Sequence, residues 1–133
     1  MLIQKELQKI FRELGEGSHV ELKCDGSNIH MRTADGTSKL FLSTSVYQGG
    51  NYIPSSVRGS LDRKAPFSAP SIRTFMTIEE SRFEIFLHYV GTGSGLTRES
   101  MKELIEEFGW VAGKWRDYLD EQDRNDLVHV RKV

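Results

Sequence analysis

A glycine-rich run, Gly91-Thr92-Gly93-Ser94-Gly95, is the segment of this sequence that most resembles a ligand-binding loop. Its position between a strand pattern and a helix start could direct backbone amides and the helix dipole at a phosphate. The lysine of a P-loop is absent, and the glycine spacing differs from the dinucleotide-binding fingerprint. The run therefore favours a flexible connector, and a phosphate-ligand binder or enzyme that uses Gly91–Gly95 remains the less favoured alternative.

The other reactive side chains form no catalytic or metal-binding pattern. The four histidines lack metal-ligand spacing, and a single cysteine, Cys24, cannot complete a zinc site with them. No nucleophile motif of the G-x-S-x-G kind accompanies the serines. Hairpin counting places His30 opposite Glu21 on a polar sheet face, which is typical of a solvated cross-strand pair. The sequence predicts no catalytic residue, no metal, no cofactor and no enzymatic activity.

Composition is that of an ordinary soluble protein. A net charge of −1 over 133 residues gives no general attraction to nucleic acid or anionic membranes. No apolar stretch approaches the roughly 20 residues that cross a bilayer, and the N-terminus interleaves charges with apolar residues, unlike a signal peptide. One cysteine permits no intramolecular disulfide, which favours a reducing compartment. We expect one cytoplasmic domain over residues 1–133, without a nucleic-acid partner or membrane insertion.

The elements that must position any site begin with two Asp-Gly dipeptides, Asp25-Gly26 and Asp35-Gly36, which predict tight hairpin turns. Centring a two-residue turn on each pairs Val20 with Met31 and then Met31 with Leu40. Both registers put the apolar residues, including Cys24, on one face, and a slip of one residue would lose that agreement. The pattern predicts a three-stranded antiparallel meander.

Hydrophobic spacing assigns the remaining elements. Stripes at helical spacing predict a first helix over about residues 2–14 and a last helix that begins at the N-cap Thr97 and continues for about five turns. Strands over about residues 72–78 and 82–90 form a hairpin, and the long connector before it leaves a short helix at 55–64 undecided. The predicted fold class is α+β: helix, three-stranded antiparallel meander, variable connector, two-stranded hairpin and long C-terminal helix.

The hairpin is apolar on both faces. Phe75, Phe86 and Val90 lie on the face that the two helices would leave uncovered. A strand pair that is apolar on both faces is usually covered on both. We therefore predict a homodimer whose interface contains these three residues.

Three further apolar residues are candidates for partner binding. Phe41 points away from the apolar face of the meander, and Leu2 lies off the stripe of the first helix, next to Ile3. An extended partner segment could add backbone hydrogen bonds at a sheet edge and place apolar anchors beside such residues. The alternative is that Leu2 frays and that the connector or a second subunit covers Phe41.

The order of elements resembles that of the class I type III secretion chaperones, the Tir-chaperone-like family. The similarity is greatest in the C-terminal part, where a strand over Phe83–Tyr89 precedes a helix reading Phe108-x-x-Val111-Ala112-x-x-Trp115-Arg116-x-x-Leu119. The resemblance implies a non-enzymatic homodimeric chaperone or adaptor that holds an extended N-terminal segment of a secreted effector or secretion-apparatus protein.

The connector departs from that family. Its members usually carry there a helix that helps to form the homodimer, whereas Gln48–Ser71 is rich in glycine and proline. This difference leaves the mode of dimerisation open. The competing interpretation is a small α+β protein-interaction module of another pathway.

Overall fold

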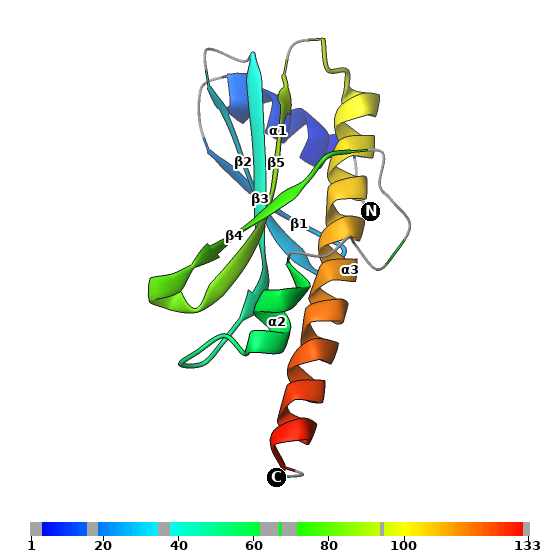
Figure 1. Ribbon diagram of the computed structural model, residues 1–133. Coiled ribbons are helices and arrows are strands. Elements are labelled where there is room, and N and C mark those ends of the chain that lie inside the picture. The colour runs from blue at the N-terminus through cyan, green and yellow to red at the C-terminus, as the bar shows by residue number, and fades with distance from the viewer. Residues whose placement is uncertain are drawn as a thin grey trace.

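The computed structural model describes residues 4–15, 19–34, 38–61, 67, 72–93 and 95–131 (Figure 1). The predicted α+β fold class is confirmed. The elements are, in chain order, α1 (Gln4–Gly15), β1 (Val20–Cys24), β2 (Ser27–Ala34), β3 (Lys39–Gln48), α2 (Ser55–Ser60), β4 (Phe75–Glu79), the 3-10 turn η1 (Glu80–Arg82), β5 (Glu84–Thr92) and α3 (Arg98–Arg131).

The strands form one antiparallel sheet in the order β1-β2-β3-β5-β4, so the meander and the hairpin join through β3 and β5. The three α-helices pack on the same side of this sheet, and α3 runs beside it and continues past one end (Figure 1). None of the helices in the described part of the chain is long and apolar enough to span a membrane.

The first hairpin has the predicted register, with Val20 opposite Met31. Asp25 and Gly26 both adopt positive φ, at 52° and 80°, as a two-residue turn of this class requires. The predicted second register is wrong by two residues, because Met31 pairs with Leu42 instead of Leu40.

The cause is the length of the second connection. Ala34 and Lys39 form the last pair of β2 and β3, which leaves four residues between them instead of two. The Asp35-Gly36 turn itself lies outside the described residues. Since side chains alternate with a period of two, an error of two residues leaves every side chain on its predicted face.

The core contains most of the stripe predicted for the first helix and all of that predicted for the last. In α1, Leu7, Ile10 and Leu14 are buried, Phe11 is half-buried, and Ile3 lies outside the described residues. In α3, the predicted stripe is buried throughout: Met101, Leu104, Ile105, Phe108, Val111, Ala112, Trp115 and Leu119. The helix is longer than predicted, because it runs through residues 126–131, which the sequence pattern left as a tail.

Cys24 is buried in this core, as predicted, and burial raises the pKa of its thiol. Gly109 of α3 packs directly against it, and a Cβ there would lie 3.2 Å from the Cys24 carbonyl oxygen. The close approach of α3 to β1 therefore depends on a residue without a side chain.

The hairpin pairs Met76 with Leu87 and Ile78 with Ile85, which confirms the predicted facing. It reverses through η1 and through Phe83 in the left-handed region, at a φ of 53°. The first strand starts at Phe75 rather than at Ile72, and the second extends to Thr92.

The connector contains a helix, α2, which resolves the question that the sequence left at residues 55–64. Ser56 Oγ donates to the Gln122 carbonyl of α3 at 3.1 Å, and Val57 is fully buried. Arg58 forms a two-point ion pair with Glu80 of η1, at 3.0 and 2.8 Å. The helix is thus fastened to elements of its own chain.

The sheet is irregular where β3 approaches the end of α3. A bulge separates Ser45 from Tyr47, and Tyr47 is buried. Burial, reinforced by a hydrogen bond to the Asp123 carboxylate, raises the pKa of Tyr47 to about 12. This hydroxyl joins the last strand of the meander to the C-terminal half of α3.

Candidate partner-binding surfaces

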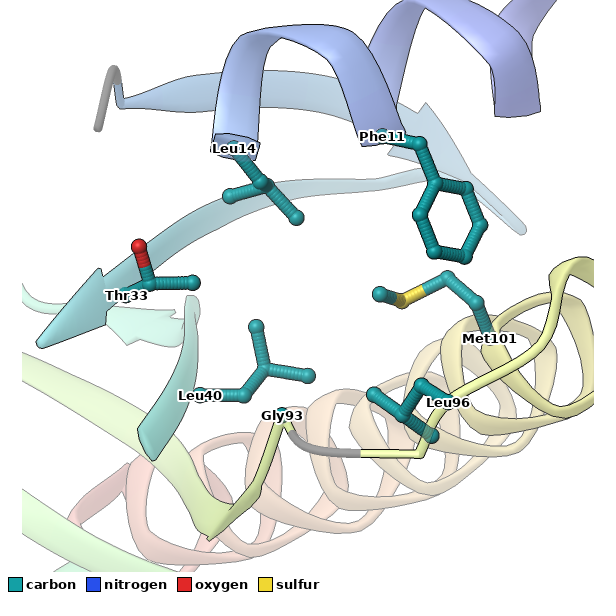
Figure 2. A pocket seen from close by; sticks show the side chains of 7 residues that line it. All are labelled: Phe11, Leu14, Thr33, Leu40, Gly93, Leu96 and Met101. Carbon is teal, nitrogen blue, oxygen red and sulfur yellow. The ribbon is translucent and has the colours of Figure 1, made fainter. Parts of the chain in front are cut away.

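An apolar pocket of about 230 Å³ lies between the C-terminal end of α1 and the start of α3 (Figure 2). We call it the apolar pocket; its lining residues are Phe11, Leu14, Thr33, Leu40, Gly93, Leu96 and Met101. Figure 2 shows the side chains of Phe11, Leu14, Leu40 and Met101 converging on this space from α1, β3 and α3. Four segments distant in sequence therefore build one apolar recess.

The start of α3 shapes one wall of the pocket. Thr97 caps the helix, because its Oγ1 accepts the Ser100 backbone N–H at 3.1 Å while Ser100 Oγ accepts the Thr97 N–H at 2.8 Å. Leu96, just before the cap, and Met101, at the fourth helical position, then occupy the positions of a hydrophobic staple. The spacing of Leu96, Thr97 and Met101 indicates a helix start, but by itself it does not indicate a binding site.

Among the residues that line the apolar pocket, Thr33 is the one with a hydroxyl group. Its Oγ1 is buried and makes no hydrogen bond to any described residue. Its methyl group points into the pocket (Figure 2). A buried polar atom without a partner costs free energy, so this position favours an apolar side chain.

We expect Thr33→Val to raise the free energy of unfolding by about 1 kcal/mol, because it removes an unsatisfied hydroxyl and keeps the shape. Urea denaturation measures the change. The matched control is Thr44→Val, since Thr44 Oγ1 donates to the Asn28 carbonyl at 2.7 Å. That control should lower the stability by a similar amount, and a loss in Thr33→Val as well would contradict the prediction.

A groove lies along the N-terminal half of α1. It has a volume of about 230 Å³ and lies between α1 and the edge strand β1, where Ile10, Val20 and Leu22 form its apolar part. Leu22 is half-buried, whereas the other two are buried. Leu2 and Ile3, predicted to bind a partner from the first helix, lie outside the described residues.

The sheet face opposite the helices, called the open face below, carries the other predicted residues. Phe75 and Val90 are 50% and 46% exposed, and Phe41 and Phe86 are half-buried. Phe41 lies opposite Val90 in the β3–β5 pairing. The residue predicted for partner binding therefore adjoins those predicted for the dimer.

Polar groups are interleaved with these rings. The Arg32 guanidinium lies over the Phe41 ring, 4.1 Å from its centre, and His88 stacks on Phe75 with ring centres 5.1 Å apart. Burial lowers the pKa of His88 and so favours its neutral ring. The ring lies 2.7 Å from the Thr77 hydroxyl, in hydrogen-bond contact. The open face thus combines these aromatic rings with the Arg32 cation.

The glycine-rich run differs from its prediction. Gly91 and Thr92 belong to β5 and not to a loop, and the Gly93 N–H donates to the Ser38 carbonyl at 3.0 Å. That amide therefore already donates a hydrogen bond within the chain and is not turned toward a phosphate. Gly93 also lines the apolar pocket. Ser94 lies outside the described residues.

The predicted His30–Glu21 pair is confirmed, with Nδ1 3.9 Å from the carboxylate. His19 stacks on His30 with ring centres 5.3 Å apart. Within the part of the chain that the structure describes, no three His, Cys, Asp or Glu side chains gather as a metal site would require.

No protein-family model matches this chain, and no curated protein matches it in sequence. Among solved structures, the fold matches a chain of the heterodimeric ExoU–SpcU complex from the type III secretion system of Pseudomonas aeruginosa. The TM-score is 0.57 at 12% sequence identity, over 87% of this chain and 96% of that chain. The chain therefore shares the overall fold of a component of that secretion complex.

Proposed function

We propose that this protein is a non-enzymatic chaperone or adaptor that binds an extended N-terminal segment of a secreted effector or secretion-apparatus protein. It acts in the cytoplasm as a homodimer and as a single domain. The observation that carries the proposal is the set of apolar recesses along α1, on a fold shared with a chain of a type III secretion heterodimer.

The recesses suit an extended chain. No described strand pairs with the outer side of the edge strand β1, which leaves it for backbone pairing with a client. The groove beside it offers Ile10 and Leu22 to alternate side chains of that client. The apolar pocket at the other end of α1 has room for one large aliphatic or aromatic side chain. A client segment that follows α1 would therefore combine strand addition with apolar anchors.

The dimer is proposed on the open face around Phe75, Phe86 and Val90. The helix of the connector, α2, is a weaker candidate for this contact, because Val57 is buried and Arg58 is paired with Glu80 within the chain. Aromatic side chains are enriched at the centres of protein interfaces. The hairpin supplies two of them on one uncovered face.

A capture experiment tests the function. Tagged wild-type protein, expressed in its source organism, should retain one stoichiometric partner that mass spectrometry identifies, and removal of that partner's N-terminal segment should abolish binding. A partner recognised through a folded domain would instead support an interaction module of another pathway. Failure to retain any secreted or secretion-apparatus protein would contradict the proposal.

Phe41→Ser tests the predicted partner-binding residue. We expect lost capture and an unchanged melting temperature, because Phe41 is half-buried under Arg32 and not in the core. Tyr52→Ser, an aromatic residue 53% exposed and outside these surfaces, is the control that should retain capture. A loss of about 3 kcal/mol in stability, as for an emptied core aromatic residue, would instead make Phe41 part of the core.

A further inference from the structure

The sheet separates between β2 and β3. Their pairing runs from His30–Ser43 to Ala34–Lys39, so the first residues of β2 pair with β1 alone and the last residues of β3 pair with β5 alone. A cavity of about 420 Å³ occupies this gap on the open face. We call it the polar cavity, since charged side chains from β1, η1, β5 and α3 reach it.

Arg116 of α3 reaches the cavity from the helix side of the sheet. Its Nη1 donates to Ser27 Oγ at 2.6 Å, and its Nη2 donates to the Asp25 carbonyl at 3.3 Å. These oxygens belong to the turn between β1 and β2 and to its flanking residues. The guanidinium is therefore held at the side of the cavity by neutral acceptors.

Glu84 is the unusual group of this cavity. The residue is 7% exposed, yet its Oε1 accepts no hydrogen bond from any described residue. The Arg82 guanidinium lies 3.3 Å away, but the Arg82 side chain is 68% exposed and stands at the rim. A buried carboxylate oxygen without a hydrogen bond is costly unless a donor reaches it.

We propose that the polar cavity binds an arginine side chain of the client segment, with the guanidinium on the Glu84 carboxylate. A planar guanidinium can donate two parallel hydrogen bonds to one carboxylate. The inference rests on the proposed function, because it assigns a residue type to the client.

The formal charges of the cavity balance, because Arg82 and Arg116 line it together with Glu21 and Glu84, and Arg116 is held by Ser27 and by the Asp25 carbonyl. Glu21 is 57% exposed. Glu21 also borders the groove between α1 and β1, so the cavity continues the proposed path of the client. In this proposal the client guanidinium takes the place of the Arg82 guanidinium on Glu84, and the exposed Arg82 side chain turns toward solvent.

Three capped pentapeptides that differ at the central residue test the proposal: Ac-Ser-Ala-Arg-Ala-Ser-NH₂ and its citrulline and glutamate counterparts. We expect the arginine peptide alone to shift the backbone amide signals of Glu84 and Phe86 in heteronuclear NMR spectra of the full chain. Citrulline has the same shape without the charge. Equal shifts with citrulline, or stronger binding of the glutamate peptide, would overturn the proposal.

Two variants locate the binding group. Glu84→Gln should weaken the arginine peptide about tenfold, the loss expected for one charged hydrogen bond. Glu79→Gln, the exposed cross-strand neighbour of Glu84, is the matched control and should bind as the wild type does. Arg82→Ala should strengthen binding, since it removes the competing guanidinium. Because the Arg82 side chain is exposed, we expect this variant to fold, and it still tests the site if Glu84→Gln does not fold. Unchanged affinity in Arg82→Ala together with normal binding in a folded Glu84→Gln would refute the assignment.

The peptide experiment tests the arginine site and the capture experiment tests the proposed function, so a failure of one can be told from a failure of the other. If the wild-type protein captures a client but the arginine peptide does not bind, the proposed function stands and the arginine site falls. If the peptide binds through Glu84 and no client is captured, the site stands as a guanidinium site and the proposed function falls.

Discussion

Phe86→Glu is expected to convert the proposed homodimer into a monomer. Phe86 lies on the open face opposite Thr77 of β4, beside the exposed Phe75 and four residues before Val90 on β5. A carboxylate at this point would be buried without a partner in each subunit, and the two-fold symmetry of the dimer would double the penalty. We expect the dimer dissociation constant to rise at least about 100-fold, equivalent to roughly 3 kcal/mol.

Sedimentation equilibrium measures this change over a range of concentrations. Phe75→Glu, at a side chain that is half exposed in the isolated chain, should have the same effect without a change in the fold. Tyr52→Glu, at an equally exposed aromatic residue of the connector, is the control that should remain dimeric. Dimers of unchanged affinity in both phenylalanine variants would place the interface elsewhere, with α2 as the next surface to test.

Local patterns predicted the elements well because their causes are local. The Asp25-Gly26 turn, the apolar stripe from Met101 to Leu119 and the shared face of Met76 and Leu87 all follow from spacing within one or two neighbouring segments. The second hairpin register failed because Asp35-Gly36 does not fix the length of its connection. Even there, each side chain lies on its predicted face of the sheet, because side chains alternate along a strand with a period of two.

The candidate sites were less predictable, because each is made by segments far apart in sequence. Thr33 and Leu96 meet at the apolar pocket only after β2 and the start of α3 pack against α1. The polar cavity beside Glu84 forms where β2 separates from β3, and Arg116 of α3 lines it from a distant part of the sequence. The local sequence pattern indicates neither the separation nor the arrival of Arg116. By contrast, Phe75, Phe86 and Val90 were found from sequence, since strand alternation alone puts them on the uncovered face.

Leu96→Asp is expected to abolish capture of the client while the fold persists. Leu96 is half-buried at the apolar pocket, where an apolar anchor of the client would cover it. Burying an unpaired carboxylate there costs about 3 kcal/mol or more, so the affinity should fall at least about 100-fold. In the free protein the loss of stability is limited, because an acidic residue just before the N-terminus of α3 interacts favourably with the helix dipole.

The measurement is isothermal titration of the captured partner's N-terminal segment into the wild-type and variant proteins, with melting temperatures recorded for both. Leu61→Asp provides the matched control, since Leu61 is also half-buried but lies at the end of α2, away from the pocket. It should bind the client with wild-type affinity. The contrast between these two leucines isolates the pocket from a general loss of apolar surface, and equal affinities in both variants would show that the client does not use it.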